Sequence, residues 1–405
     1  MLAETGVEPA GDEGGFLQRV PLERARTLEA KLELASAGGE KLALDPGRDF
    51  DAPTRAAALE GLALVVVRAA ADVPKEGAGR TALFVDAPSA RRRALLEEAG
   101  RPDGRGFALL LAPGSSKARE PRAADALSPP RPPPAAGAPP LLRVHGAALE
   151  RLRAGEFALA SFAARVETQT VDAWNVVGVV RGAGTGSEPG LATEAVVLSA
   201  HHDHLPEPAA RPGEAEGADR VHNGADDDAS GCAAVLEIAA AFAHGPRPAR
   251  TIVVLLAAAE EIGLHGTRHY LGAPAVPLER TVANLNFEMV GRPDALVGGA
   301  GRLWLTGFER TNLGPAFAAA GLPILADPRP EQNFYQRSDN YAFVERGVVG
   351  QTFSSYDLHE DYHRPSDEAD KLDWAHMEAA VRAAHAACAR VASGELDPAW
   401  TESPR

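Results

Sequence analysis

The hydrophobic positions in the C-terminal half of the chain form short apolar runs separated by amphipathic stretches. The runs NVVGVV, EAVVLSA, TIVVLLAAA, TVANLNF, RLWLTG and GVVGQTF have the length and the β-branched content of strands. Residues 229–244, 264–272 and 374–392 have the spacing of helices. This alternation predicts a three-layer α/β sandwich with a mostly parallel central sheet. The run TIVVLLAAA is typical of a strand that is covered on both faces.

The first part of the chain has a different pattern, which predicts a smaller domain inserted into the sandwich. Residues 1–46 include a strand and a turn that begin the sandwich. Residues 47–165 carry the runs GLALVVV, TALFVDA and GFALLLA, and we expect a β-rich domain there. Seven of the twelve residues 129–140 are proline, which is typical of an extended surface loop. Residues 166–395 then complete the sandwich.

Composition narrows the possible classes of function. The 405 residues are 45% hydrophobic and 24% charged, as in a globular protein with two domains. There are 41 basic and 56 acidic residues, and the net charge of −15 argues against binding to nucleic acids. The only cysteines are Cys232 and Cys388, so a disulfide scaffold is excluded. Any metal site must therefore use nitrogen and oxygen ligands.

We expect neither a membrane span nor a signal peptide in this chain. No apolar run approaches the roughly 18–20 residues that a membrane helix needs. The first residues are acidic, the first positive side chain is Arg19, and no apolar core follows the N-terminus.

Two adjacent carboxylates, Glu260 and Glu261, follow the most apolar strand of the chain. Two neighbouring carboxylates repel each other, and burying either without compensation is unfavourable. If the strand continues through them, they point to opposite faces. One can then bind a metal while the other, Glu260, acts as a general base on a water molecule.

Further histidine and carboxylate residues lie near other expected strand ends. Each alone is also typical of a strand end, a helix N-cap or a surface loop. Together they supply five nitrogen and oxygen donors suited to zinc, namely His201, Asp227, Glu261, Glu288 and His363. The two oxygens of Asp227 can bridge two metal ions about 3.5–4 Å apart. Because ligands bind at the carboxyl ends of parallel strands, we expect these residues to meet there.

Three other residues complete the predicted site. Asp203 follows His201 by two positions, so its carboxylate can accept the free ring N–H of that histidine. Tyr362 offers a phenolic O–H that can stabilise an oxyanion. Arg337 offers a guanidinium for a carbonyl or carboxylate oxygen.

These motifs resemble a known family. The segments AHHDH, GADDDASG, AAAEEIGLHG, NFEMVG, RSDNYAF and DYHRPSD, in this order within residues 175–393, are similar to those of the di-zinc aminopeptidases of the bacterial leucyl-aminopeptidase and aminopeptidase-Y type. That family is related to glutamate carboxypeptidase and to the transferrin receptor ectodomain. The resemblance also implies that FLQRVPL is the first strand and that residues 47–165 form a protease-associated domain.

The resemblance implies a role for each matching residue. His201 and Glu261 bind zinc, Asp227 bridges the two ions, and the positions of Glu288 and His363 complete their ligand sets. Glu260 is the general base and Asp203 supports a ligand, while Tyr362 and Arg337 contact the substrate carbonyl or the product. The family more often has Asp in place of Glu288. Its members are usually exported, so the resemblance implies that the N-terminus is truncated.

We therefore expect a zinc-dependent exopeptidase that holds two zinc ions and removes N-terminal residues from peptides. A carboxypeptidase or a glutaminyl-cyclase-like enzyme on the same fold is an alternative, although the cyclase needs one zinc ion only. A receptor-like interaction module without activity is the alternative outside enzymes. Loss of ligands would be the mark of such a module, and no ligand type is missing here.

Overall fold

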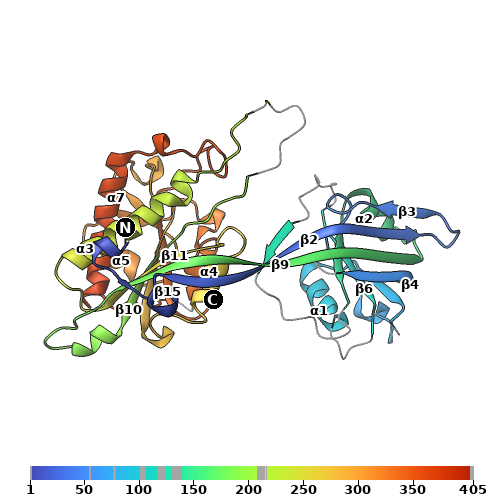
Figure 1. Ribbon diagram of the computed structural model, residues 1–405, viewed down its shortest axis with the longest axis horizontal. Helices are drawn as coiled ribbons and strands as arrows, with labels where there is room; N and C mark the ends of the chain where they lie inside the picture. Colours follow the sequence, from blue (N-terminus) through green and yellow to red (C-terminus); the bar gives the residue numbers. More distant parts are fainter. Residues whose placement is uncertain are drawn as a thin grey trace. The chain divides into compact units, whose positions relative to one another are not determined.

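A computed structural model describes residues 2–53, 56–75, 79–100, 106–115, 125–128, 139–207, 215 and 217–401 (Figure 1). The chain divides into two compact units, Met1–Val20 with Asp172–Arg405, and Pro21–Val171. Both boundaries fall within long strands, β2 (Leu17–Ala35) and β9 (Leu159–Val180). Most of the predicted proline-rich loop, residues 129–138, lies outside the described residues.

A mostly parallel sheet forms the centre of the first unit. Its strand order is β14–β13–β15–β12–β10–β11–β9, and β1 (Glu8–Pro9) pairs with β9. Strand β10 lies parallel to both β11 and β12, and β12 lies parallel to β15. The bounds are β10 (Ala195–His201), β11 (Thr251–Ala257), β12 (Thr281–Phe287), β13 (Leu303–Leu305), β14 (Ile324–Ala326) and β15 (Val349–Ser354).

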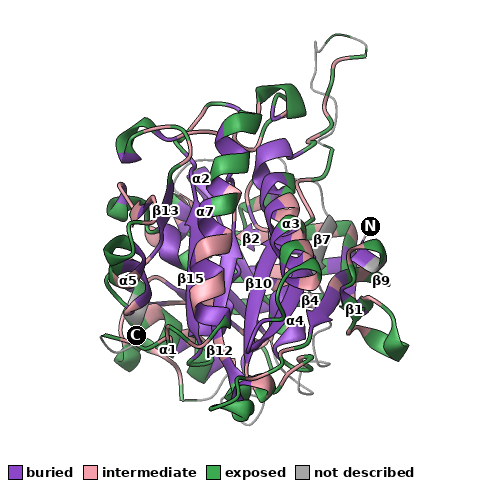
Figure 2. Ribbon diagram, turned by 90° about the vertical axis from the view of Figure 1, so that its left-hand side faces the viewer, coloured by how far each residue is buried: buried purple, intermediate pink, exposed green. Residues whose placement is uncertain are grey.

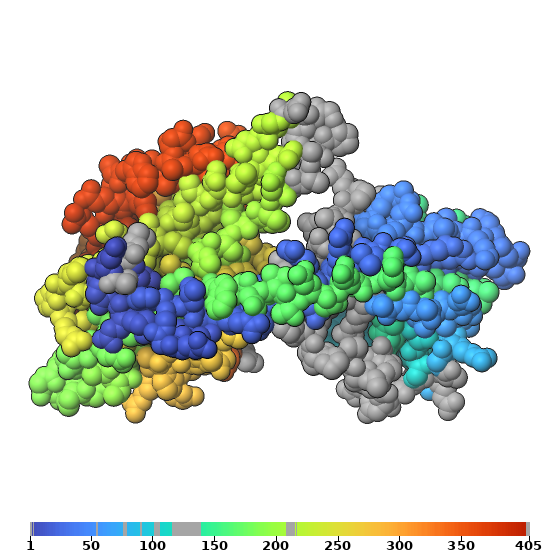
Figure 3. Space-filling view, viewed as in Figure 1, coloured from blue at the N-terminus to red at the C-terminus, as the bar shows by residue number. Residues whose placement is uncertain are grey.

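Helices cover both faces of this sheet. On one face, α3 (Gly231–His244), α5 (Leu313–Ala319) and α7 (Trp374–Ala392) contribute to the largest hydrophobic cluster. On the other face, α4 (His265–Tyr270) and α6 (Asn340–Val344) belong to a separate cluster. Helices α3 and α7 lie side by side in the space-filling view (Figure 3). The predicted three-layer α/β sandwich is therefore confirmed.

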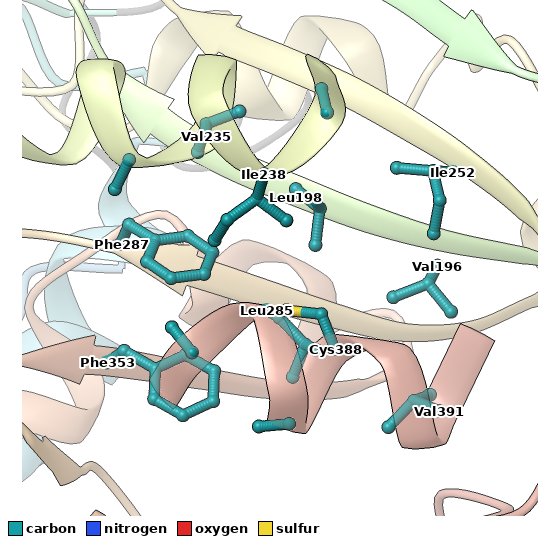
Figure 4. Packing of buried hydrophobic residues seen from close by; sticks show 14 of the residues in the cluster. Val196, Leu198, Val235, Ile238, Ile252, Leu285, Phe287, Phe353, Cys388 and Val391 are labelled. Carbon is teal, nitrogen blue, oxygen red and sulfur yellow. The ribbon is translucent and has the colours of Figure 1, made fainter. Parts of the chain in front are cut away.

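The core explains why the central strands are so apolar. Every residue of β10 and β11 is buried, because helices cover both sides of these strands (Figure 2). Leu198 and Leu285 on the strands pack near Ile238 of α3 and Cys388 of α7 (Figure 4). Small residues such as Ala384 are fully buried in α7, which lets this helix approach the sheet closely.

The second unit is also an α/β structure. Strands β4, β5, β6 and β8 form a parallel series, and β4 pairs with β9 in the antiparallel direction. Strand β2 pairs with β3 and β7. The bounds are β3 (Lys41–Leu44), β4 (Ala57–Val67), β5 (Thr81–Val85), β6 (Leu109–Pro113), β7 (Asp125–Ser128), β8 (Leu141–Val144), α1 (Ser89–Ala99) and α2 (Gly146–Arg153). Its assignment as a protease-associated domain over 47–165 stays a prediction.

Several elements differ from the sequence prediction in their ends. Strand β11 ends at Ala257 rather than Ala259, and Ala259 has a positive φ of 58°. Helix α3 begins at Gly231 rather than 229, because 225–230 form a separate turn in which Asp227 and Asp228 have non-helical backbone angles. The short elements β14, α5 and α6 have too few residues to show a period. None of the described helices is long and apolar enough to cross a membrane.

Replacing one core leucine tests the packing. Leu198→Ala should lower the free energy of unfolding by about 2–5 kcal/mol, because Leu198 is fully buried between sheet and helices. Leu296→Ala is the matched control, since Leu296 is 64% exposed, and we expect a change within about 0.5 kcal/mol. Urea-induced unfolding of the metal-free proteins measures both, and equal effects would contradict the assigned core.

Candidate metal centre and active site

The parallel sheet brings the predicted site residues to one edge. His201 is the last residue of β10, and Glu288 directly follows β12. Glu260 and Glu261 come three and four residues after the end of β11. Because β11, β10 and β12 are parallel neighbours, their carboxyl ends meet, as in other open α/β sheets.

Two groups of potential metal ligands share one carboxylate. Among the described residues, the ligand atoms of His201, Asp227 and Glu288 lie within 4.8 Å of one another, and so do those of His204, Asp227 and Glu261. Asp227 Oδ1 lies 3.1 Å from His201 Nε2, and Asp227 Oδ2 lies 3.2 Å from His363 Nε2. Each oxygen of Asp227 therefore faces a different histidine, as a bridging carboxylate requires.

A buried ion pair holds the backbone at Asp227. Asp367 is fully buried, and its Oδ2 accepts the N–H groups of Asp226 and Asp227 at 3.0 and 3.1 Å. Its Oδ1 lies 2.9 Å from Arg292 Nη2, while Arg292 Nη1 lies 2.7 Å from Asp361. The sequence analysis did not identify Arg292 or Asp367, since no local pattern links residues so far apart.

Asp228 connects the same loop to the sheet. The peptide bond between Asp227 and Asp228 is cis. Asp228 Oδ2 accepts the N–H of His201 at 3.2 Å, and Oδ1 accepts those of Gly231 and Met289 at 3.1 and 3.0 Å. The contact with Gly231 ties this loop to the first residue of α3. Burial raises the pKa of Asp228 well above its usual range, against the effect of His201.

Glu260 and Glu261 diverge for a reason other than the one predicted. They lie in the turn after β11, so strand alternation does not separate them. Glu260 Oε2 lies 4.0 Å from His201 Nε2, whereas Glu261 Oε2 lies 3.4 Å from His363 Nε2. The backbone turn at Ala259 thus places one carboxylate beside each histidine.

Asp203 contacts His201 as predicted, but it does so through its main-chain oxygen and not through its carboxylate. His201 Nδ1 lies 2.9 Å from the main-chain oxygen of Asp203 and 3.8 Å from its Oδ1. The carboxylate instead accepts the main-chain N–H of Glu260 at 3.0 Å. The path of the loop after β10 brings the main-chain carbonyl of Asp203 closer to the His201 ring than its carboxylate. Asp203 thereby supports both His201 and Glu260.

Burial of several carboxylates perturbs their protonation. Burial raises the pKa of Glu288 to about 7, although His201 opposes this. Ser338 donates a hydrogen bond to Glu288, but its buried Oε2 has no partner among the described residues. Burial also raises the pKa of Glu260 well above its usual range, again against the effect of His201. Burial therefore favours the protonated forms of Glu260 and Glu288 when no metal is bound.

The histidines respond in the opposite direction. Burial lowers the pKa of His201, but contacts with Asp227 and Asp228 outweigh it, so this pKa is well above the usual value. The same balance of burial against Asp227 and Glu261 raises the pKa of His363. Burial raises the pKa of Asp227, but the imidazoles of His201 and His363 lower it by more, so the pKa is below its usual value. The imidazoles of His201 and His363 therefore stabilise the ionised form of the Asp227 carboxylate.

A pocket of about 260 Å³ opens beside the carboxylates. Tyr362 and Arg337 both line it, and Arg337 Nη2 lies 3.4 Å from the Tyr362 hydroxyl. The Tyr362 ring stacks on His363 at 3.8 Å between centroids. Burial, and then Asp227, raise the pKa of Tyr362, so its hydroxyl keeps its proton at neutral pH. The apolar part of the lining consists of Leu264, Met289, Trp304, Phe334 and Tyr356.

A further histidine, His204, lies beside the predicted ligands. Only 9% of its side chain is exposed. Its Nδ1 lies 2.6 Å from Glu261 Oε1. Its position one residue after Asp203, beside two other histidines of AHHDH, was the available signal.

Breaking the ion pair behind Asp227 tests how the loop is held. Arg292→Met leaves the fully buried Asp367 without its cation, so the free energy of unfolding should fall by about 3 kcal/mol or more. Arg382→Met is the matched control, because its pair with Glu378 is exposed, and we expect a loss below about 0.5 kcal/mol. Urea-induced unfolding of metal-free protein measures both. Similar losses would show that Arg292 does not stabilise this loop.

Known structures share this fold. An aminopeptidase from Aneurinibacillus sp. strain AM-1 is similar over 99% of this chain and 87% of that one, with 18% identity and a TM-score of 0.60. A zinc aminopeptidase from Bacillus subtilis is similar over 96% of this chain and 85% of that one, with 17% identity and a TM-score of 0.47. A glutaminyl cyclase from Porphyromonas gingivalis matches 56% of this chain and 79% of that one, with 17% identity and a TM-score of 0.40. At these identities the likeness establishes a fold only, and only the first TM-score is high enough to do so.

Sequence comparison identifies the family directly. No curated protein matches this chain in sequence. The model of peptidase family M28, however, matches residues 175–388, more than half of the chain and every segment that carries the site described above. The predicted family resemblance is thus confirmed at the level of the family, and the chain belongs to peptidase family M28.

Proposed function

We propose that this peptidase is a zinc-dependent aminopeptidase that uses two zinc ions. The observation that carries the proposal is the pair of ligand groups that share Asp227. Membership of a peptidase family supports hydrolysis of peptides as the reaction.

The residues present suit zinc. His201, Asp227 and Glu288 would hold one ion. Asp227 and Glu261 would hold the other together with His363, whose Nε2 lies 3.2 and 3.4 Å from oxygens of these two carboxylates. Imidazole nitrogens and carboxylate oxygens are ordinary zinc ligands, and the unpaired buried Oε2 of Glu288 offers a ligand atom. Bound zinc ions would lower the pKa of a water molecule and polarise the scissile carbonyl.

Glu260 would act as the general base. Its side chain is 9% exposed, it lines the pocket, and its main-chain N–H is fixed by Asp203. It belongs to neither group of potential ligands, so it is free to accept a proton from water. It would then pass this proton to the leaving amine.

Tyr362 and Arg337 would contact the substrate carbonyl on the opposite side. Their mutual contact at 3.4 Å places a hydroxyl and a guanidinium together at the pocket. A protonated phenol and a cation both stabilise an oxyanion through hydrogen bonds. Neither group has to transfer a proton in this role.

Attack on the N-terminal residue follows from the charge of the site. A protonated amine next to the scissile bond is attracted by carboxylates, and Glu260 and Glu288 are the nearest candidates in the pocket. A carboxypeptidase would need a cationic anchor for the C-terminus, for which Arg337 is the alternative. A glutaminyl-cyclase reaction needs one zinc only and leaves the second ligand group without a role.

Metal content and turnover together test the two glutamates. Wild-type protein should hold two zinc ions per chain. Glu260→Gln should keep both and lose about 10²–10⁴-fold in kcat, because it removes the base and no ligand. Glu261→Gln is the matched control and should lose zinc. Elemental analysis and peptide hydrolysis measure these effects. At most one zinc after reconstitution would refute the two-zinc site, and zinc loss in Glu260→Gln would reverse the two roles.

Peptides with free and acetylated N-termini test the direction of attack. Free peptides should be cleaved about 10–100-fold faster in kcat/KM, since a charged hydrogen bond to the amine is lost on acetylation. Release of single residues, followed by mass spectrometry, measures this. Release of C-terminal residues from acetylated peptides would keep the zinc mechanism and overturn the aminopeptidase assignment. Glu288→Asp, assayed on both substrates, would then show whether Glu288 sets the choice.

A further inference from the structure

His204 has no role in the proposed mechanism, yet it contacts a proposed zinc ligand. It lies in the loop after β10, and its Nδ1 lies 2.6 Å from Glu261 Oε1. Both side chains are only 9% exposed. Its ligand atom also lies within 4.8 Å of those of Asp227 and Glu261. This contact is therefore part of the metal centre rather than of the surface.

The contact fixes the tautomer of the His204 ring. A nitrogen lone pair would repel a carboxylate oxygen at 2.6 Å, so Nδ1 carries the hydrogen and donates it to Glu261. In the neutral ring, Nε2 then keeps a lone pair, and this buried atom has no hydrogen-bond partner among the described residues. The opposite tautomer would leave a buried N–H unpaired, which is rarer in proteins than an unpaired acceptor.

The surroundings keep both side chains in place. The rings of His363 and His222 lie edge-on to that of His204, with centroids 5.6 and 6.0 Å away. Glu261 Oε2 lies 3.4 Å from His363 Nε2, on the side of Asp227. One oxygen of Glu261 is thus bonded to His204, while the other faces the ligands of the second zinc.

We propose that His204 is a positioning residue, which holds Glu261 through the Nδ1–H···Oε1 hydrogen bond so that Oε2 alone binds the second zinc. This inference rests on the proposed two-zinc function. A ligating carboxylate that is already oriented loses less side-chain freedom when the metal binds. Removing such a partner typically lowers metal affinity about 10–100-fold.

The test compares zinc affinities of the wild type, His204→Ala, His204→Asn and His202→Ala. Competition with a chromophoric chelator gives both dissociation constants. His204→Ala should raise one of them about 10–100-fold and leave the other unchanged. His204→Asn should restore most of the loss, because the asparagine amide can donate from the position of Nδ1. His202→Ala should match the wild type, since His202 is exposed and its Nε2 lies 2.8 Å from the main-chain oxygen of Trp174.

Three outcomes would overturn the inference. Wild-type affinity in His204→Ala would show that the hydrogen bond does not matter for zinc. An equal loss in His204→Asn and His204→Ala would show that the ring itself binds metal. A lower Tm of the metal-free protein with unchanged zinc affinity would show a packing role only. A wild-type chain that binds fewer than two zinc ions would overturn the proposed function itself, and with it this inference.

Discussion

A buried carboxylate that faces two imidazoles is the interaction on which the rest of the site depends. Asp227 is 2% exposed, and its oxygens lie 3.1 and 3.2 Å from His201 and His363. His201 comes from a strand end of the parallel sheet, and His363 comes from a loop 162 residues further along the chain (363 − 201). Hydrogen bonds from the Asp227 loop to Asp367 hold the carboxylate between them. Sheet, loop and ion pair must therefore all form before the site exists.

The charge of the pocket explains why two dications suit it. Asp227, Glu260, Glu261 and Glu288 line one cavity of about 260 Å³, and Arg337 is the only arginine or lysine among its described lining residues. Burial raises the pKa of Glu260 and of Glu288, which favours their protonated forms when no metal is bound, whereas contacts with two imidazoles lower the pKa of Asp227. For Glu288 the pKa rises to about 7. The two zinc ions that we propose would carry four positive charges and would balance these four carboxylates in their ionised forms.

The sequence predicts the sheet and the residues at its edge better than the atoms that touch. Strand ends at His201 and near Glu288 follow from the apolar runs, which are long because both faces are covered. The turn after Ala257 cannot be predicted from the sequence, because alanine is not a residue typical of turns, although Ala259 has a positive φ. The spacing of His201 and Asp203 indicates proximity, but only the loop path decides that a main-chain carbonyl makes the contact. The pairing of Arg292 with Asp367 depends on tertiary structure alone.

The partners of each carboxylate separate its oxygens into two roles. Glu261 has one oxygen bonded to His204 and the other toward His363. Glu288 is bonded by Ser338, while its Oε2 is buried and unpaired among the described residues. In each case the protein occupies one oxygen and leaves one for a ligand. Asp227 differs, because both of its oxygens face imidazoles and its main chain, not its carboxylate, is bonded to Asp367. Both oxygens of Asp227 therefore face proposed zinc ligands, which is the arrangement that a bridging carboxylate needs.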